Sequence, residues 1–473
     1  MSQTDLYNVK AHHHDIPEIY ELCQAGVPED ELETLEMQTK VARFWSEARH
    51  PTLGLSPDNW LFSKDGKSDV VSKLSAMVDF AFTQVPMYRE IYGNAGYEAG
   101  SIRSLDDFKK LPILTRADLN CWADDDRLSS GNKVSETYFV GTSGSSGQSL
   151  KVFYDQKAAI TETYESLVQF SSYVGGRLSP DAWIYNIHMS RGWLSSLKGK
   201  YRTFTISEPA SIKAMTDHLS KIRPAIMCAL PSHLSELAPI GDMSKFGIRA
   251  ISTNSEQSSR LERKNFESIF GVPVLDEYSS VELGVIAYEG FCGSYHVNED
   301  GLHIEIVDPD EGGFGRVVAT DFRSWVMPLI RYDQGDLAAW SNNIDICKCG
   351  RPGKRFRDLR GRADDYFLAM DGKKIPSATL LNLVDTLFTS PESPLREFRL
   401  QQVAPDRAQL DYVLRDGEIV MPMTMQSSLE QKLVNLMGEG SRVEFMCREA
   451  LDSTPSYKRK KSCVNSDHKS DPR

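Results

Sequence analysis

A short run of small residues is the part of this sequence most suited to binding a ligand. Positions 141–147 contain only Gly, Ser and Thr, and they follow the apolar pair Phe139-Val140. Because glycine lacks a Cβ atom and tolerates positive φ, such a loop can bring backbone N–H groups close to an anion. The run predicts a phosphate-binding loop, although no Lys-Ser/Thr pair follows its last Gly, as a GxxxxGK[ST] loop requires. A Gly/Ser hairpin turn is the alternative interpretation.

A second stretch able to do chemistry follows an apolar strand at 272–275. It contains Asp276, Glu277, Tyr278 and Glu282, with serines among them. An aromatic ring can stack on a base, a hydroxyl can reach a phosphate and a carboxylate can hold Mg²⁺. On these residues alone, an ordinary turn with a surface Glu explains the stretch equally well.

Four residues have the types and the grouping of a metal site. Cys292-x₃-His296 and Cys347-x-Cys349 stand apart from the other cysteines. Such ligands suit tetrahedral zinc, although the spacings are not those of standard zinc fingers. Because four protein ligands leave no open position, the predicted zinc is structural. The alternatives are His303 as a ligand, or unrelated residues with cysteines acting as small hydrophobes.

Strands and helices that alternate along the chain must position these residues. Apolar segments at 183–187, 226–230 and 248–253 are predicted strands, and an amphipathic helix is predicted over 69–90. Strands alternating with helices imply a largely parallel sheet that is covered on both faces. Ligands of such sheets bind at the carboxyl ends of the strands, where we expect the loops between these elements to lie.

Composition narrows the class of protein. The 473 residues are enough for two or three domains, and the formal charge of −12 argues against a nucleic-acid partner. No run of 18 or more apolar residues predicts a membrane span, and the first residues do not resemble a signal peptide. The scattered cysteines favour a reducing compartment, so a cytoplasmic protein is expected.

Further motifs give the chain a family resemblance. The segments 85–89, 105–108 and 115–119 (Thr-Arg-Ala-Asp-Leu) are similar to the N-terminal part of the phenylacetate–CoA ligase-like enzymes. These enzymes form a branch of the adenylate-forming (ANL) superfamily. The run 142–147 is similar to the superfamily's Ser/Thr/Gly phosphate loop. Its usual Lys-Pro ending is replaced by Gln-Ser, so either Lys151 replaces the missing charge or the amides and hydroxyls of the loop suffice.

The nucleotide site that the resemblance implies extends over later motifs. Residues 278–282 resemble Tyr-Gly-x-Thr-Glu, in which the Tyr flanks adenine and Glu282 helps to hold Mg²⁺. Residues 331–336 resemble Arg-Tyr-x-Thr-Gly-Asp, whose Asp accepts hydrogen bonds from the ribose hydroxyls. The implied ATP-binding residues are Thr142, Ser143, Gly144, Ser145, Ser146, Gly147, Ser255, Glu256, Asp276, Glu277, Tyr278, Ser279, Ser280, Asp336 and Arg362.

The C-terminal part has the pattern of a small mobile domain. Residues 360–367 resemble the family's hinge, in which Arg362 contacts the nucleotide and Asp364 is the pivot. A β-β-α-β pattern beyond it predicts a separate α+β lid. The expected division is an adenylation domain at 1–362, which includes an N-terminal extension at 1–68, and a lid at 363–473. The expected fold class is therefore α/β with mixed, largely parallel sheets, plus the small lid.

A basic tail supplies the last catalytic residue of the resemblance. Lys458 corresponds to the Lys of Ser-Gly-Lys, which neutralises negative charge during adenylation, and Tyr457 stands in place of the Gly. A solvated basic tail is the alternative interpretation. The implied catalytic residues are Lys458, Glu282 and Thr142. By position alone, we expect His188 and Ser232 to lie near the substrate acid.

The resemblance implies an ATP-dependent, AMP-forming carboxylate ligase. Such an enzyme uses Mg·ATP to convert an acid, often an aryl acid, to an acyl-AMP, and then transfers the acyl group to the thiol of CoA or of a carrier protein. The sequence leaves two alternatives open. An amine acceptor would give an amide instead, and a nucleotide-binding protein that has lost catalysis would explain the degenerate motifs. We expect no nucleic-acid or membrane partner.

Overall fold

The structure, a computed structural model, describes most of the chain after residue 69. The described residues are 70–142, 150–154, 156–187, 193–197, 200–206, 209, 211–341, 347–351, 353–362, 366–388, 394–414, 420–449, 451 and 462–464. The predicted N-terminal extension at 1–68 lies outside them. Among the described residues, no helix is long and apolar enough to cross a membrane.

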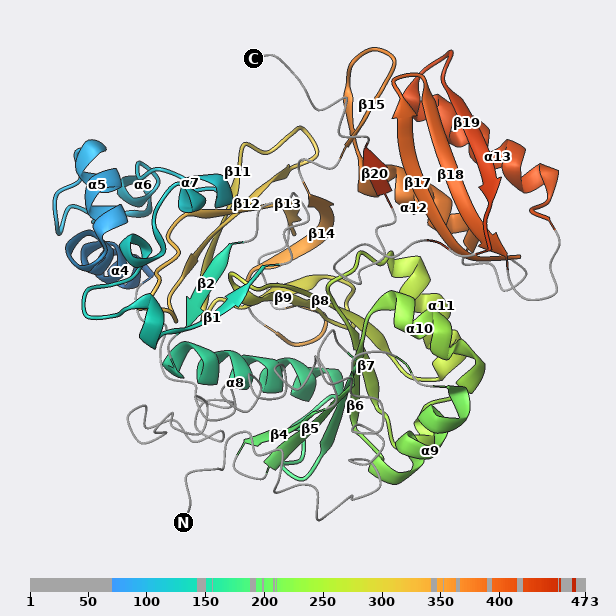
Figure 1. The fold of residues 1–473 in the computed structure, drawn as a ribbon, viewed down its shortest axis with the longest axis horizontal. Helices are drawn as coiled ribbons and strands as arrows, with labels where there is room; N and C mark the ends of the chain where they lie inside the picture. The colour runs from blue at the N-terminus through green and yellow to red at the C-terminus, as the bar shows by residue number, and fades with distance from the viewer. Residues whose placement is uncertain are drawn as a thin grey trace.

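The described part begins with short helices that pack beside the large sheet (Figure 1). The helix predicted over 69–90 is divided in two at Val85, which is extended because the residue before a proline disfavours the helical region. The short helix at 116–120 begins with a capping box between Thr115 and Asp118. These helices are α4 (Val70–Gln84), α5 (Pro86–Asn94), α6 (Leu105–Phe108), α7 (Arg116–Asn120), and the 3₁₀ turns η3 (Asp124–Arg127) and η4 (Val134–Glu136).

A 12-stranded mixed sheet forms the centre of the larger part, in the order β11-β12-β13-β14-β10-β9-β8-β7-β6-β3-β5-β4. Pairing is parallel from β5 through β3, β6 and β7 to β8, and antiparallel elsewhere. The strands are β3 (Trp183–Ile187), β4 (Trp193–Leu197), β5 (Lys200–Ile206), β6 (Ile226–Ala229), β7 (Ala250–Thr253), β8 (Val274–Ser280), β9 (Gly284–Glu289), β10 (Tyr295–Val297), β11 (Leu302–Val307), β12 (Phe314–Asp321), β13 (Tyr332–Trp340) and β14 (Arg355–Arg362).

Helices cover both faces of the parallel strands, as the sequence predicts. Ile184, Ile226 and Ala250 pack with residues of α8 in one core, whereas their neighbours Met227 and Ile251 pack with α9 and α11 in another. This alternation follows from the two-residue period of a strand. The covering helices are α8 (Gln156–Tyr173), α9 (Ile212–Ile222), α10 (Pro231–Leu237) and α11 (Arg260–Phe270), with the 3₁₀ turns η5 (Ala238–Ile240) and η6 (Ser244–Phe246).

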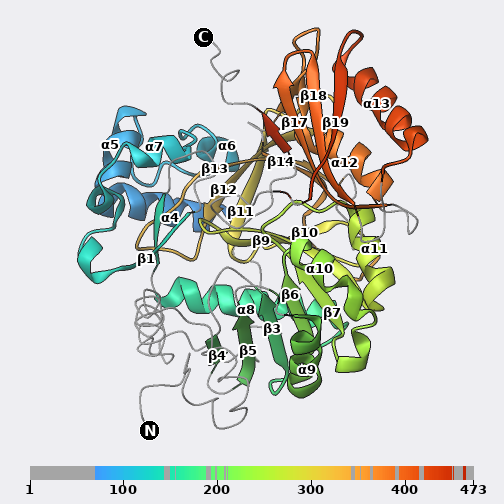
Figure 2. The same cartoon turned by 45° about the vertical axis from the view of Figure 1, so that its right-hand side comes forward.

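A smaller α+β unit follows β14 and has its own core (Figures 1 and 2). Its four-stranded sheet has the order β19-β18-β17-β20, and helices α12 and α13 belong to the same apolar core. The predicted fold class, a mixed α/β part plus a small α+β part, is confirmed, while the boundary at 362 stays a prediction. The elements are β15 (Tyr366–Leu368), β16 (Lys374–Pro376), α12 (Ser377–Phe388), β17 (Leu395–Ala404), β18 (Arg407–Leu414), α13 (Met423–Met437), β19 (Arg442–Cys447) and β20 (Ser462–Val464).

Candidate functional site

The predicted phosphate loop connects the two strands of a hairpin. β1 (Tyr138–Gly141) pairs antiparallel with β2 (Lys151–Tyr154), and Gly141 lies opposite Lys151. Buried Thr142 closes the base of the loop, because its N–H donates to the Leu150 carbonyl at 2.9 Å and its Oγ1 accepts from the Leu150 N–H at 2.9 Å. The loop residues 143–149 lie outside the described residues, so phosphate binding by them stays a prediction.

Lys151, the expected substitute for the missing loop lysine, is already paired. Its Nζ lies 2.7 Å from Asp124 Oδ2 and 5.4 Å from the centre of the Phe139 ring. Burial tends to raise the pKa of Asp124, but hydrogen bonds from Lys151 and Arg127 outweigh it and the pKa is lowered. In this arrangement Lys151 and Arg127 share the carboxylate of Asp124, and a role of Lys151 toward the loop stays a prediction.

Glu282, the predicted Mg²⁺ ligand, is buried in a polar cluster with two partners. Arg116 Nη2 lies 2.7 Å from its Oε1, and the hydroxyl of Tyr332 donates to the same oxygen at 3.1 Å. Coulombic attraction to Glu282 overcomes the effect of burial and raises the pKa of Arg116. Arg116 and Tyr332 both contact Oε1, so a cation would have to approach through the second oxygen.

The predicted adenine and ribose residues meet across the sheet. The hydroxyl of Tyr278 on β8 donates to Asp336 Oδ2 on β13 at 2.9 Å, and Ser280 donates to Gln334 Oε1 at 3.3 Å. In the sheet order, β9, β10 and β14 separate β8 from β13, so the antiparallel half must curl to bring these side chains together. The sheet thus joins two motifs that are far apart in the sequence.

Arg362 lies beside Asp336 at the end of β14. Its Nε is 4.0 Å from Asp336 Oδ1, and its Nη1 donates to the Gln334 carbonyl at 2.9 Å. A Cβ atom on Gly335 would lie 2.8 Å from Arg362 Nη2, and φ at Gly335 is +81°. Glycine is therefore required here, both for the backbone conformation and for the approach of the guanidinium. The predicted hinge residue Asp364 lies outside the described residues.

Three other predicted ATP ligands belong to partly buried networks. The carboxylate of Asp276 accepts hydrogen bonds from Thr253 at 2.9 Å and Tyr295 at 2.8 Å, and burial raises its pKa to about 6. Glu277 accepts from Ser279 at 2.7 Å, and burial raises the pKa of Glu277. These bonds are internal to the fold, and direct contact of the three residues with ATP stays a prediction.

Ser232 and Glu256 form a pair at the start of α10. Glu256 accepts from the Ser232 backbone N–H and from its hydroxyl, each at 3.0 Å. Ser255, just before it, has φ of +65°, an uncommon conformation for a residue other than glycine. Glu256, a predicted ATP-binding residue, and Ser232, which we expect near the substrate acid, are therefore neighbours. The other acid-side residue, His188, and the predicted catalytic Lys458 lie outside the described residues.

The four predicted metal ligands converge on one point. One potential ligand atom from each of Cys292, His296, Cys347 and Cys349 lies within 4.8 Å of the others. His296 Nε2 is 3.5 Å from Cys292 Sγ and 3.2 Å from Cys349 Sγ. Gly350 has φ of +80° and donates its N–H to the Cys347 carbonyl, which forms a tight turn around the second cysteine pair.

His303, the alternative ligand, is not part of this group. It lies on β11 with its ring 5.7 Å from that of Phe108. Burial and the nearby cations Lys354, Lys109 and Arg331 lower its pKa to about 4. Its surroundings are those of a packed, neutral histidine.

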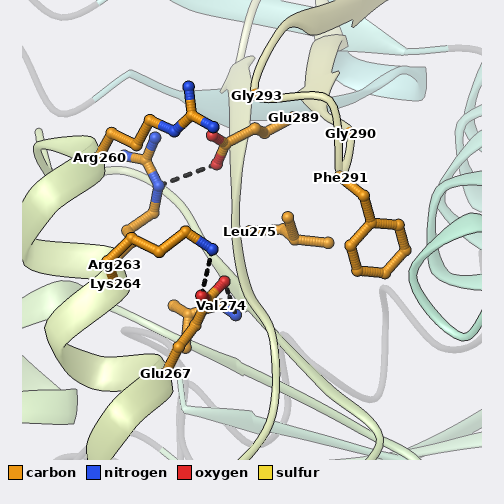
Figure 3. A pocket seen from close by; sticks show the side chains of 10 residues that line it. All are labelled: Arg260, Arg263, Lys264, Glu267, Val274, Leu275, Glu289, Gly290, Phe291 and Gly293. Carbon is orange, nitrogen blue, oxygen red and sulfur yellow. Dashed lines mark hydrogen bonds and ion pairs between the residues drawn. The ribbon is translucent and has the colours of Figure 1, made fainter. Parts of the chain in front are cut away.

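A buried ion pair supports the turn that carries Cys292. Arg263 of α11 lies 2.9 Å from Glu289, the last residue of β9, immediately before the turn (Figure 3). Glu289 also accepts a hydrogen bond from the Asp276 N–H at 3.3 Å. A Cβ atom on Gly293 would lie 2.4 Å from the Arg260 guanidinium, so this glycine allows α11 to approach the turn. The turn that carries Cys292 and the β8 residue Asp276 thus share one polar network.

Sequence reasoning missed the partners that hold these residues. Arg116 lies within the quoted Thr-Arg-Ala-Asp-Leu motif, but the sequence did not indicate a contact with Glu282, 166 positions away. Tyr332 lies within the Arg-Tyr motif and was likewise not assigned. The signal available was membership of a motif, which marks a residue without naming its partner.

The chain has the fold of the CoA ligases of known structure. It superimposes on 2-hydroxyisobutyryl-CoA ligase in the postadenylation state, in complex with 2-HIB-AMP, with a TM-score of 0.68 and 18% identity, covering 84% of this chain and 89% of that one. An open conformation of that ligase, in complex with 2-HIB-AMP and CoA, gives a TM-score of 0.56 and 20% identity over 84% and 91% of the two chains.

Curated sequences give a more particular likeness. The phenylacetate-coenzyme A ligase of Thermus thermophilus is 25% identical over 327 residues, which cover 63% of this chain and 70% of that protein. The phenylacetate-coenzyme A ligase of Escherichia coli is 24% identical over 353 residues, 68% of this chain and 77% of that one. No family model matches the chain. The predicted resemblance to phenylacetate–CoA ligases is confirmed.

Proposed function

We propose that this protein is an ATP-dependent, AMP-forming ligase that activates a carboxylic acid and transfers the acyl group to the thiol of CoA. The observation that carries the proposal is the meeting of Tyr278 with Asp336 across the curled sheet, 2.9 Å apart. An aromatic ring beside a carboxylate suits a base and its ribose. The likeness to phenylacetate–CoA ligases supports an acid of the aryl type.

The reaction has two steps in which bonds and charges balance. A carboxylate oxygen of the acid attacks the α-phosphorus of ATP, and pyrophosphate leaves with its electron pair. The thiolate of CoA then attacks the acyl carbon, and AMP leaves. The protein contributes positioning and charge stabilisation to both steps.

In this proposal each motif of the family resemblance has one role. Tyr278 and Ser279 line the adenine side, Asp336 and Arg362 hold the ribose, and the loop that begins at Thr142 holds the departing phosphates. Lys458 neutralises negative charge as the acid attacks. Because Lys151 is paired with Asp124 at 2.7 Å, we propose that backbone amides and hydroxyls of the loop stabilise the negative charge of the phosphates.

Mg²⁺ is the expected companion of the ATP phosphates. The donor set fits a hard cation, because Glu282 offers a buried carboxylate that Arg116 and Tyr332 contact through the same oxygen. When bound, the ion would neutralise phosphate charge. Arg116 and Tyr332 would orient the carboxylate through their contacts with Oε1.

We further propose that Cys292, His296, Cys347 and Cys349 hold a structural Zn²⁺. The donor set is three thiols and one imidazole within 4.8 Å, which fits tetrahedral coordination. The ion would tie the turn after β9 to the chain between β13 and β14. It would leave no position for substrate, so its contribution is to stability.

The test is ATP–pyrophosphate exchange with a panel of aryl and aliphatic acids, followed by product analysis. Exchange that depends on an acid, and a CoA thioester as product, are the expected results. An amide formed with an added amine, in place of a thioester, would favour the amide-forming alternative. ATP binding without exchange for any acid in a wide panel would overturn the proposal and favour a protein that has lost catalysis.

A further inference from the structure

The turn that carries Glu282 is held in place by hydrogen bonds from side chains to its backbone carbonyl groups. The hydroxyl of Tyr154 donates to the Val281 carbonyl, and Arg323 Nη2 donates to the Leu283 carbonyl at 2.7 Å. The backbone on both sides of Glu282 is therefore bonded to side chains from other elements. The Leu283 N–H also donates to Ser280 Oγ at 3.1 Å, which fixes the turn from the β8 side.

Arg323 is itself immobilised. Its side chain is 2% exposed and lies 2.6 Å from Glu165 of α8 and 2.8 Å from Asp321 at the end of β12. Attraction to these carboxylates outweighs burial and raises the pKa of Arg323, so the guanidinium stays charged. A Cβ atom on Gly284 would lie 3.2 Å from Arg323 Nη1 at a φ of +50°, so the glycine permits this close contact.

Tyr154 connects the turn to the phosphate hairpin. It is the last residue of β2, the strand that follows the Gly/Ser loop. Its ring packs against the apolar core that the N-terminal helices share with the antiparallel strands. Burial and nearby carboxylates, including Glu162 and Glu282, raise the pKa of its hydroxyl well above the usual value. The hydroxyl therefore remains protonated and able to donate throughout the physiological range.

We propose that Tyr154 and Arg323 are positioning residues that set the place of the Glu282 carboxylate relative to the base of the β1–β2 hairpin, where Thr142 pairs with Leu150. This inference rests on the proposed function, because it assigns the loop to the phosphates and Glu282 to their Mg²⁺. One hydrogen bond from β2 fixes the turn relative to the hairpin, and the Arg323 network fixes it relative to α8 and β12. A ligand that spans both sites then meets them already in register, and no ordering of the turn opposes binding.

The decisive variant is Tyr154→Phe, which removes one hydroxyl and keeps the ring. The matched control is Tyr97→Phe, which removes another largely buried tyrosine hydroxyl, bonded to Asp79 at 2.6 Å in the N-terminal helices. Acid-dependent pyrophosphate exchange is measured as a function of free Mg²⁺. We expect the half-saturating Mg²⁺ to rise about three- to tenfold in Tyr154→Phe, the range for one lost hydrogen bond, and to stay unchanged in the control.

Unchanged Mg²⁺ dependence in Tyr154→Phe, or an equal change in both variants, overturns the inference. A second readout separates it from the proposed function. If the native protein shows no pyrophosphate exchange with any acid, the proposed function fails. Hydrogen–deuterium exchange then still tests whether Tyr154 holds the turn that carries Glu282. Faster amide exchange at 281–285 in Tyr154→Phe, relative to Tyr97→Phe, supports it, and equal exchange overturns it.

Discussion

A suitable replacement of Glu282, chosen from its contacts, separates the catalytic role that we propose for it from its structural role. The carboxylate is 3% exposed and Arg116, its partner at 2.7 Å, is 19% exposed. Glu282→Ala would leave Arg116 and the Tyr332 hydroxyl without this acceptor. An uncompensated buried charge costs on the order of 3–5 kcal/mol, and the partial exposure of Arg116 places this case near the lower value.

Glu282→Gln keeps the volume and one carbonyl oxygen for both donors. A charge-assisted bond becomes a neutral one, so we expect a loss of about 1–2 kcal/mol in the free energy of unfolding. A neutral amide is a poor ligand for Mg²⁺ beside phosphates. We therefore expect the rate of acid-dependent exchange to fall about a hundredfold or more in Glu282→Gln, although the protein remains folded.

The assay is pyrophosphate exchange across a range of free Mg²⁺, with urea unfolding of each variant measured alongside. Arg116→Lys is the matched control, since it keeps a cation beside an unaltered carboxylate. Exchange in Glu282→Gln at the native rate and native Mg²⁺ dependence would refute the assignment. A loss of exchange that simply follows the loss of stability across the variants would also refute it.

Three further predictions address other parts of the protein. Lys458→Ala should abolish acid-dependent exchange and leave the conversion of supplied acyl-AMP and CoA intact; unchanged exchange would remove Lys458 from the site. The purified protein should contain about one zinc per chain and Cys347→Ser should lose it, whereas a metal-free folded native protein would end the zinc proposal. Because the pKa of His303 falls to about 4 on folding, its stability contribution is present above about pH 6.5 and is lost as pH falls toward 4, by up to about 3 kcal/mol. His303→Gln should reduce this acid destabilisation in urea unfolding at pH 5 relative to pH 7.5, and an identical pH dependence would contradict the assignment.

Local patterns carried much of the fold. The strand at 226–230 and the helix of the β-β-α-β pattern, observed as α13, were predicted because apolar residues recur with the periods of their elements. The hairpin formed by β1 and β2 corresponds to the turn that was the alternative interpretation of the Gly/Ser run. The cluster of Cys292, His296, Cys347 and Cys349 was predicted because cysteine and histidine are few and their chemistry is specific.

Long-range electrostatics could not be read in this way. The pairing of Glu282 with Arg116 and that of Arg323 with Glu165 join residues 166 and 158 positions apart. Charged residues are common, so no pattern in the sequence selects one partner among many. The same limit applies to Lys151, whose pairing with Asp124 no pattern in the sequence indicates.

The curl of the antiparallel strands was the other feature beyond sequence reasoning. Tyr278 and Asp336 could be assigned to one nucleotide only by resemblance, because their strands are not neighbours in the sheet. Their contact depends on the accumulated twist of β8 to β14, which arises from the whole sheet and not from either motif. The motifs identified Tyr278 and Asp336, whereas only the folded sheet shows that the two residues are in contact.

In the proposed reaction, a carboxylate oxygen of the acid attacks the α-phosphorus of ATP. Isotope labelling of that oxygen shows directly whether this bond forms. An acid that supports exchange is prepared with ¹⁸O in its carboxylate and turned over with ATP and CoA, and the products are analysed by mass spectrometry. The account predicts AMP that carries one ¹⁸O atom, unlabelled pyrophosphate and a CoA thioester. Label in inorganic phosphate, with ADP as the nucleotide product, would contradict it.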